Sequence, residues 1–260
     1  MSFISCNGHV IHYNYINNNS DQTFLFINSL GTDFRIWEEV ASSLKEFGNI
    51  LLYDKRGHGL SDVSKPGGGL KDYAGDACGL LEELSIQNCI VIGISVGGMI
   101  APILAHTCPG LIKKIIVCGA ANKIGNTQTW NDRIGQVRTN GLKAITETLM
   151  KRWFSSSFHE KYPERVAGYK NMVERCDVEG YVQACEAIRD EDITGISTSL
   201  RIPTLCIVGS EDQSVSPADV RALSQSINDA RFEIINGSCH MTCIDNKEIF
   251  TKLIVDFLKW

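Results

Sequence analysis

The chain has 260 residues, 43% of them hydrophobic, and a formal net charge of −5. This composition predicts one globular domain with a large core, and the absence of a run of about 18 apolar residues or a secretory signal leads us to expect a cytoplasmic protein without a membrane helix. Basic residues are scattered rather than clustered, which argues against nucleic acid and anionic membranes as partners.

The first elements of the chain are typical of an antiparallel hairpin. Residues 3–6 and 9–15 read as two strands, and the dipeptide Asn7-Gly8 between them favours a tight hairpin turn. We therefore expect these two strands to form an antiparallel edge of a sheet.

Strands and helices then alternate along the chain. Short apolar runs predict interior strands, and apolar residues at helical spacing predict helices. In chain order, they are a strand at 23–27, a helix at 33–47, a strand at 49–54, a helix at 70–85, a strand at 89–92, a helix from 96, strands at 113–118, 203–209 and 230–235, and a helix at 247–260. With the hairpin, this predicts an α/β fold, a mostly parallel eight-stranded sheet with helices on both faces.

The alternation stops between residues 121 and 200. This stretch contains long polar and amphipathic segments and no strand-like run. We interpret 121–200 as an inserted helical cap, and residues 1–120 and 201–260 as the two parts of the core.

The loop at 55–62 contains glycines that partly match a nucleotide-binding motif. Gly57 and Gly59 have the spacing of the first two glycines of a dinucleotide fingerprint, but the third is missing and no helix follows directly. A dinucleotide site is therefore not expected. His58 is interpreted as a structural residue of this turn.

The most informative stretch is 88–107, where Gly93-x-Ser95-x-Gly97 lies between an apolar strand and an apolar helix. This is the nucleophile-elbow pattern, in which glycines let the strand and helix pack closely around a strained serine. The serine hydroxyl is then exposed at the positive end of the helix that begins at Val96. Pro102 falls inside this helix and is expected to kink it or displace its second turn.

Three polar residues, Ser95, Asp212 and His240, each follow the carboxyl end of a predicted strand, where ligands of parallel α/β sheets bind. Their order along the chain is that of the catalytic triad of α/β hydrolases. His240 would take the proton of the poorly nucleophilic serine, and Asp212 would orient the imidazole and stabilise its cation. Glu211 is a rival acid, but Asp212 is preferred because it stands three residues after Gly209.

Two backbone N–H groups are predicted to form the oxyanion hole of such a site. One belongs to Leu30, in the loop after the first interior strand, and the other to Val96, directly after the serine. The alternative interpretation of residues 28–32 is a plain strand-to-helix loop.

The ten cysteines are expected to be free thiols in a reducing compartment. Cys89, Cys118 and Cys206 lie inside apolar runs, where a thiol behaves as a small core residue. The stretch Cys239-His240-x-x-Cys243 contains possible metal ligands, but the sequence has no second cluster of Cys or His residues with the spacing of a zinc site. We therefore expect neither a metal nor another cofactor.

Much of the chain resembles the 3-oxoadipate enol-lactonase family of the α/β-hydrolase superfamily. Besides the elbow, the similar stretches are NSLGTD at 28–33, YDKRGHGLS at 53–61, AANKIG at 120–125, WNDRI at 130–134, RWF at 152–154 and GYVQACEAIRD at 180–190. The resemblance implies a carboxylic ester hydrolase that opens the lactone ring of a small, carboxylate-bearing enol-lactone during the breakdown of aromatic acids.

The resemblance also implies how such a substrate is held. A cap arginine would pair with its carboxylate, with Arg133 as first choice and Arg189 as second. Trp130 and Trp153 would form walls of the pocket, unless they serve only core packing.

Two other functions stay open. The first is another small-ester or carbon–carbon bond hydrolase, or a cofactor-free perhydrolase, on the same scaffold. The second is a non-catalytic ligand receptor, since this fold also serves binding. A dehalogenase is disfavoured because its elbow nucleophile is aspartate, whereas the residue here is Ser95. The sequence does not indicate an oligomeric state.

Overall fold

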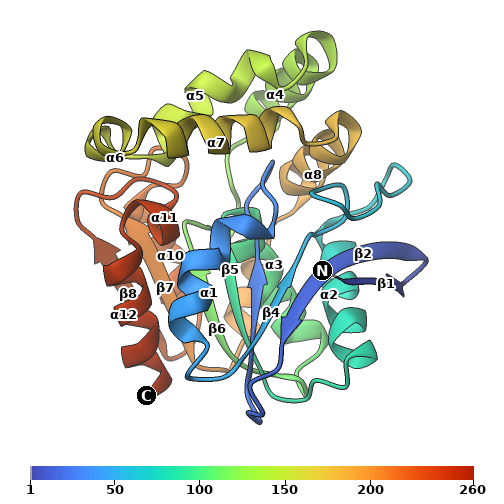
Figure 1. The fold of residues 1–260 in the computed structure, drawn as a ribbon, viewed down its shortest axis with the longest axis vertical. Helices are drawn as coiled ribbons and strands as arrows, with labels where there is room; N and C mark the ends of the chain where they lie inside the picture. Colours follow the sequence, from blue (N-terminus) through green and yellow to red (C-terminus); the bar gives the residue numbers. More distant parts are fainter. Residues whose placement is uncertain (1) are drawn as a thin grey trace.

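The structure is a computed structural model that describes residues 2–260. Eight strands form one sheet in the order β1-β2-β4-β3-β5-β6-β7-β8 (Figure 1). They are β1 (Ser2–Cys6), β2 (His9–Ile16), β3 (Thr23–Ile27), β4 (Asn49–Tyr53), β5 (Cys89–Ile94), β6 (Ile112–Cys118), β7 (Thr204–Gly209) and β8 (Ala230–Ile235). β2 pairs antiparallel with β1 and β4, and all other neighbours are parallel, so the predicted α/β-hydrolase architecture is confirmed.

The edge hairpin forms as its turn residues predict. Asn7 and Gly8 both have positive φ, at 51° and 79°, which is the conformation that a two-residue hairpin turn requires. The register places Cys6 opposite His9, so the strands pair up to the turn.

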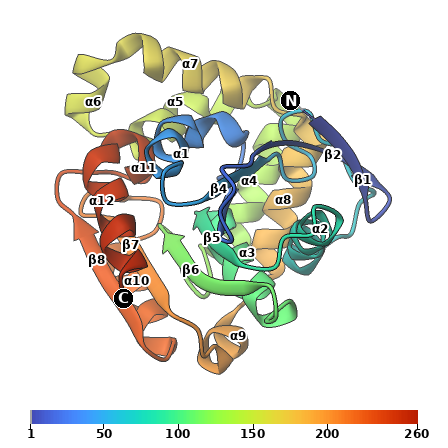
Figure 2. The same ribbon diagram turned by 60° about the horizontal axis from the view of Figure 1, so that its bottom comes forward.

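The helices of the core lie on both faces of the sheet (Figures 1 and 2). They are η1 (Phe34–Trp37), α1 (Glu38–Leu44), α2 (Leu70–Glu83), α3 (Val96–Thr107), α10 (Pro217–Ser226), α11 (Thr242–Asp245) and α12 (Lys247–Leu258). α1 packs against α12, and α2 packs against α3. Because both faces are covered, the interior strands β3, β4, β5 and β7 are buried along their whole length.

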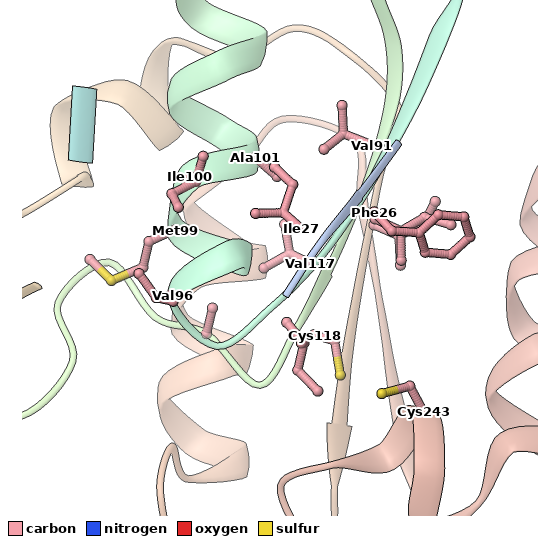
Figure 3. Close-up of a cluster of buried hydrophobic side chains, with 14 of the residues drawn as sticks. Phe26, Ile27, Val91, Val96, Met99, Ile100, Ala101, Val117, Cys118 and Cys243 are labelled. Carbon is pink, nitrogen blue, oxygen red and sulfur yellow. The ribbon is translucent and has the colours of Figure 1, made fainter. Parts of the chain in front are cut away.

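The core continues from the sheet into both layers of helices. On one face, α3 packs against β3, β5 and β6, and Ala101 of α3 belongs to the same buried cluster as Ile27 and Val117 of the sheet (Figure 3). On the other, the ring of Trp37 lies 5.3 Å from that of Phe26 and 6.1 Å from that of Phe250. These apolar layers fix the strand ends from which the candidate site is built.

Helices fill the chain between β6 and β7. They are α4 (Thr127–Asn140), α5 (Lys143–Trp153), α6 (Ser156–Lys161), α7 (Pro163–Glu174), α8 (Val178–Asp190) and α9 (Thr194–Ser199). α4 to α8 lie above one end of the sheet, whereas α9 packs against α3 and α10 of the core (Figures 1 and 2). The division into a core of 1–120 and 201–260 and a cap of 121–200 stays a prediction.

Several local features differ from expectation. The helix predicted at 33–47 is divided into η1 and α1, and α10 and α11 were not predicted. α10 does carry a start signal, because the Ser216 side chain accepts a hydrogen bond from the Asp219 N–H and Pro217 occupies the first turn. α3 runs through Pro102 as one continuous helix, so its second turn is not displaced as the alternative expectation had it.

One cysteine pair corrects the prediction that all thiols are free. A disulfide joins Cys78 of α2 to Cys108, which follows the last residue of α3. The packing of α2 on α3 brings their Cα atoms to 6.6 Å although they are 30 residues apart, which spacing along the chain does not reveal. The remaining eight cysteines are free, and all but Cys176 are buried. Within residues 2–260, no helix is both long and apolar enough to cross a membrane.

Candidate active site

Ser95 occupies a sharp turn between β5 and α3. Its φ of 58° and ψ of −120° are strained for a residue with a side chain, and its N–H is held by the Cys118 carbonyl at 2.8 Å. The flanking glycines make this turn possible. A Cβ on Gly93 would lie 2.1 Å from the Gly97 carbonyl oxygen, and one on Gly97 would lie 2.2 Å from that of Ile27. The glycine pattern therefore reflects close backbone approach, as the elbow prediction requires.

Asp212 and His240, which follow β7 and β8, form a buried hydrogen-bonded pair. His240 Nδ1 lies 2.8 Å from Asp212 Oδ2, while Oδ1 of the same carboxylate accepts the N–H groups of Ser214 at 2.7 Å and Val215 at 3.0 Å. Because Nδ1 donates to the carboxylate, the neutral imidazole keeps Nε2 free as the basic nitrogen. Glu211 is exposed, so Asp212 is the acid that contacts the histidine.

Ser95 and His240 line one cavity, with a volume of about 190 Å³. Its floor includes Ser29 and Leu30 of the loop after β3. From the helical insertion, the lining residues include Trp130, Arg133, Leu149, Arg152, Trp153, Tyr181 and Ile188. The structure thus brings two of the predicted triad residues to a common cavity and places the third against the imidazole.

The loop that carries His240 is fastened to the helical insertion. The His240 N–H donates to the carbonyl of Arg152 at 3.3 Å. The Asp245 carboxylate accepts the Cys239 N–H at 2.8 Å and the Ser155 hydroxyl at 2.7 Å. Sequence reasoning missed Asp245, which joins the histidine loop to the end of α5.

The loop that contains Leu30 is hydrogen-bonded to His58. The Gly31 N–H donates to His58 Nε2 at 3.0 Å, and Nδ1 lies 3.2 Å from the Arg56 carbonyl. Burial, with a smaller contribution from the charge of Lys55, lowers the pKa of His58 well below its ordinary value, so the ring is neutral with its proton on Nδ1. This contact gives His58 the structural role that was predicted.

Of the two residues predicted to supply oxyanion donors, one lines the cavity with Ser95 and the other follows Ser95 directly in the chain. Leu30 lines the cavity, and Val96 is the first residue of α3, where the backbone N–H has no acceptor within the helix. The assignment of these N–H groups to an oxyanion hole stays a prediction.

Two arginines face the cavity from neighbouring helices. Arg133 of α4 lies over the ring of Trp130, 5.0 Å from its centroid, and Arg152 comes from α5. Within residues 2–260, neither arginine forms an ion pair with an acidic side chain. Two unpaired cations in one cavity of an acidic protein favour an anionic ligand.

Arg152 was not predicted as a site residue, although its helical spacing from Leu149 and Trp153 could have indicated it. Leu149, Arg152 and Trp153 follow one another at intervals of three and one, so they share one face of α5. A depression of about 310 Å³ also borders α4 and α5 and shares Thr129, Arg133, Leu149 and Arg152 with the cavity.

Arg189, the second choice for a carboxylate ligand, does not line the cavity. Its guanidinium binds the Asp190 carboxylate at 2.7 Å and the Asn131 side chain at 2.9 Å. Ile188, its neighbour on α8, faces the cavity instead. Since successive helical residues are rotated by about 100°, the two side chains cannot point the same way.

Aromatic side chains close the cavity on the helical side. Trp130 is nearly buried, and its Nε1–H donates to the Ile124 carbonyl at 2.6 Å. Trp153 is also buried, and both tryptophans line the cavity as well as the core. The hydroxyl of Tyr181 has no hydrogen-bond partner within the described residues. Burial raises the pKa of Tyr181, an effect that the charge of Arg133 opposes.

The stretch Cys239-His240-x-x-Cys243 does not have the geometry of a metal motif. His240 Nδ1 binds Asp212, and Cys243 is buried, which raises the pKa of its thiol. Among the residues that the structure describes, no group of three or more His, Cys, Asp or Glu side chains is arranged to hold a metal ion.

Comparison with known proteins connects this geometry to a family. Residues 18–247 match the model of the hydrolase family described as serine aminopeptidase, S33. The chain is 31% identical to 3-oxoadipate enol-lactonase 2 and 33% identical to 3-oxoadipate enol-lactonase 1 of Acinetobacter baylyi, in each case over 90% of this chain and 88% of the relative. The crystal structure of the enol-lactonase from Burkholderia xenovorans matches with a TM-score of 0.96 and 31% identity, covering 100% of both chains. The chain therefore belongs to this hydrolase family and is an α/β hydrolase of the 3-oxoadipate enol-lactonase type.

Proposed function

We propose that the protein is a serine hydrolase that opens the lactone ring of 3-oxoadipate enol-lactone to give 3-oxoadipate, a step in the breakdown of aromatic acids. The observation that carries the proposal is a single small cavity that contains Ser95, His240 and the unpaired guanidinium of Arg133. Relatives named as enol-lactonases over nearly the whole chain support the same substrate class.

In this mechanism, Ser95 attacks the lactone carbonyl while His240 Nε2 takes the hydroxyl proton. Asp212 holds the imidazole through Nδ1 and stabilises its cation. The Leu30 and Val96 N–H groups stabilise the tetrahedral oxyanion, and each such donor lowers the barrier by about 3 kcal/mol.

Collapse of the tetrahedral intermediate breaks the ring C–O bond and expels an enolate. An enolate leaves more readily than an alkoxide. The His240 imidazolium gives the leaving enolate the proton that it took from Ser95, and the resulting enol tautomerises to the ketone of the product. His240 then removes a proton from water, which attacks the acyl-enzyme and releases the new carboxylate with Ser95 restored.

The free carboxylate of the substrate pairs with Arg133. A planar guanidinium binds a carboxylate through two parallel hydrogen bonds, which fixes its orientation. Trp130 and Trp153 exclude water from this end of the cavity, where both side chains are nearly buried. Arg152 supplies a second positive charge at the same cavity.

Turnover of the enol-lactone, followed against neutral p-nitrophenyl esters, tests the proposal. We expect the carboxylate-bearing lactone to have the higher kcat/KM, and Ser95→Ala to lower kcat by several orders of magnitude while the fold is retained. A wild-type protein that hydrolyses neither substrate would favour a ligand receptor, and one that prefers the neutral esters would favour a general esterase.

A further inference from the structure

The carbonyl of Ser29 receives an unusual number of hydrogen bonds. Lys55 Nζ donates to it at 2.6 Å, Thr32 Oγ1 at 3.0 Å and the Thr32 N–H at 3.3 Å. This carbonyl belongs to the same peptide group as the N–H of Leu30. Since the peptide is planar and trans, its N–H points away from its C=O. Contacts to the Ser29 oxygen therefore fix the direction of the Leu30 N–H.

Lys55 is buried, with 1% of its surface exposed. The two carboxylates whose charges act on Lys55 are engaged elsewhere, because Asp54 binds His12 at 2.7 Å and Asp33 pairs with Arg35. Within the described part of the chain, the hydrogen bond of the ammonium is therefore directed at the Ser29 carbonyl rather than at an acid.

A lysine buried in this way costs stability. Removing an ammonium group from water is unfavourable unless a close counter-ion compensates. Burial lowers the pKa of Lys55 to about 7, and the charges of Cys176, Asp54 and Asp33 offset only part of this effect. The two Thr32 donors would satisfy the Ser29 carbonyl even without the lysine. The lysine is therefore not needed to satisfy the Ser29 carbonyl.

We propose that Lys55 is a positioning residue of the oxyanion hole, which holds and polarises the Ser29–Leu30 peptide so that the Leu30 N–H becomes a stronger and better-aligned donor. This inference rests on the proposed function, because it assumes that the Leu30 N–H contacts the reacting oxygen. Hydrogen bonds in a chain polarise one another, and a charged donor on the carbonyl strengthens the N–H on the other side of the same peptide. The contribution appears only when negative charge develops, so it should change kcat more than KM.

Lys55→Met tests the proposal, because methionine fills a similar volume without a charge or donor. We expect a Tm equal to or above that of the wild type, a kcat at least about tenfold lower on the enol-lactone and a KM changed by less than about twofold. Lys71→Met, which makes the same change at an exposed lysine, should leave all three values unchanged. An unchanged kcat in a folded Lys55→Met protein would overturn the inference.

The pH profile of the wild type gives a second test that needs no variant. Lys55 loses its charge as the pH rises through about 7, so its contribution to kcat should fall between about pH 6 and pH 8, a fall that folded Lys55→Met should lack. The groups that surround the ammonium are Asp33, Asp54, Cys176 and His58. A wild-type kcat that stays constant over this range would count against the inference. If the wild type does not turn over the enol-lactone at all, it is the proposed function that fails, whereas an active wild type with an equally active Lys55→Met variant refutes the role of Lys55 alone.

Discussion

Gly119 lies directly after β6 and contacts the Asp212–His240 pair. Its φ is 50°, and a Cβ placed on it would lie 3.1 Å from His240 Nδ1 and 3.2 Å from Asp212 Oδ2. These separations are tighter than ordinary van der Waals contact, so Gly119→Ala forces the imidazole or the carboxylate to shift by a few tenths of an ångström. The substitution therefore disturbs the candidate base without removing any polar group.

Gly119→Ala should have two effects, a loss of stability from the positive φ and a loss of rate from the displaced side chains. The positive φ costs an alanine about 1–2 kcal/mol. At about 2–4 °C per kcal/mol for a chain of this size, the Tm should fall by about 2–8 °C. A misplacement of 1 Å at a reacting group can cost about 100-fold in rate, so a shift of a few tenths should lower kcat by about tenfold.

Gly141→Ala is the matched control. Gly141 has a φ of 70°, but no atom lies within 4 Å of the position of its Cβ. It therefore also has a positive φ, with a ψ of 177° that is unfavourable for alanine, but it lacks the contact. We expect a loss of Tm in both variants, measured by circular dichroism, and a lower kcat only in Gly119→Ala, measured from initial rates at saturating enol-lactone. Equal kcat values in folded Gly119→Ala and Gly141→Ala would refute the inferred contact.

Four further predictions follow from other parts of the structure. Arg133→Gln should raise the KM for the carboxylate-bearing lactone by about 10- to 100-fold, because a charged hydrogen bond is worth about 1.5–3 kcal/mol, and should leave that of a neutral ester unchanged in steady-state kinetics. Reduction of the Cys78–Cys108 disulfide, which closes a loop of 30 residues, should lower the free energy of unfolding by about 3–4 kcal/mol in urea titrations. Asp245→Asn should lower kcat and not only the Tm, because the carboxylate holds the loop that carries His240. The free energy of unfolding should also fall as the pH rises from about 9 to about 12. Burial raises the pKa of Cys206 from 9.0 to about 12, so only the unfolded thiol ionises in this range. Cys206→Val should remove this contribution from the pH dependence of urea unfolding.

Each of these predictions has an outcome that would contradict it. An equal rise in KM for charged and neutral substrates would show that Arg133→Gln distorts the cavity rather than removing an anion ligand. Unfolding curves that do not respond to reductant would exclude a stabilising cross-link. A fall in Tm without a fall in kcat would limit Asp245 to folding, and an identical pH dependence in Cys206→Val would exclude that thiol as its source.

The strands and the Ser95 turn were predictable because their determinants are local. An interior strand covered on both faces must be apolar along its length, so β3, β4, β5 and β7 appear in the sequence as short apolar runs. At the elbow, close backbone contacts allow only glycine at positions 93 and 97. The meeting of Asp212 and His240 then follows from the parallel sheet, which places the residues after β7 and β8 at the same edge.

The remaining features depend on packing that no local pattern encodes. Arg133 was the first choice and Arg189 the second on helices of unknown orientation, and only the direction that α8 faces turns Arg189 away from the cavity. The Cys78–Cys108 bond requires the contact between α2 and α3. Lys55 lies in the stretch 53–61 that resembles the family, but the sequence does not show its contact with the Ser29 carbonyl. That contact depends on how the two loops are placed in the fold.

The hydrogen bonds between the histidine loop and α5 bear on how a substrate reaches the site. If the helices α4 to α8 swung away as a rigid lid, they would pull on the hydrogen bond to the Arg152 carbonyl and on the Asp245–Ser155 contact, and so would displace His240, the predicted general base. The outer depression between α4 and α5 shares four lining residues with the cavity, so side-chain movements there would open a path that leaves these hydrogen bonds intact. The position of His240 is therefore coupled to that of α5, and any movement of α5 would be transmitted to the imidazole through these hydrogen bonds.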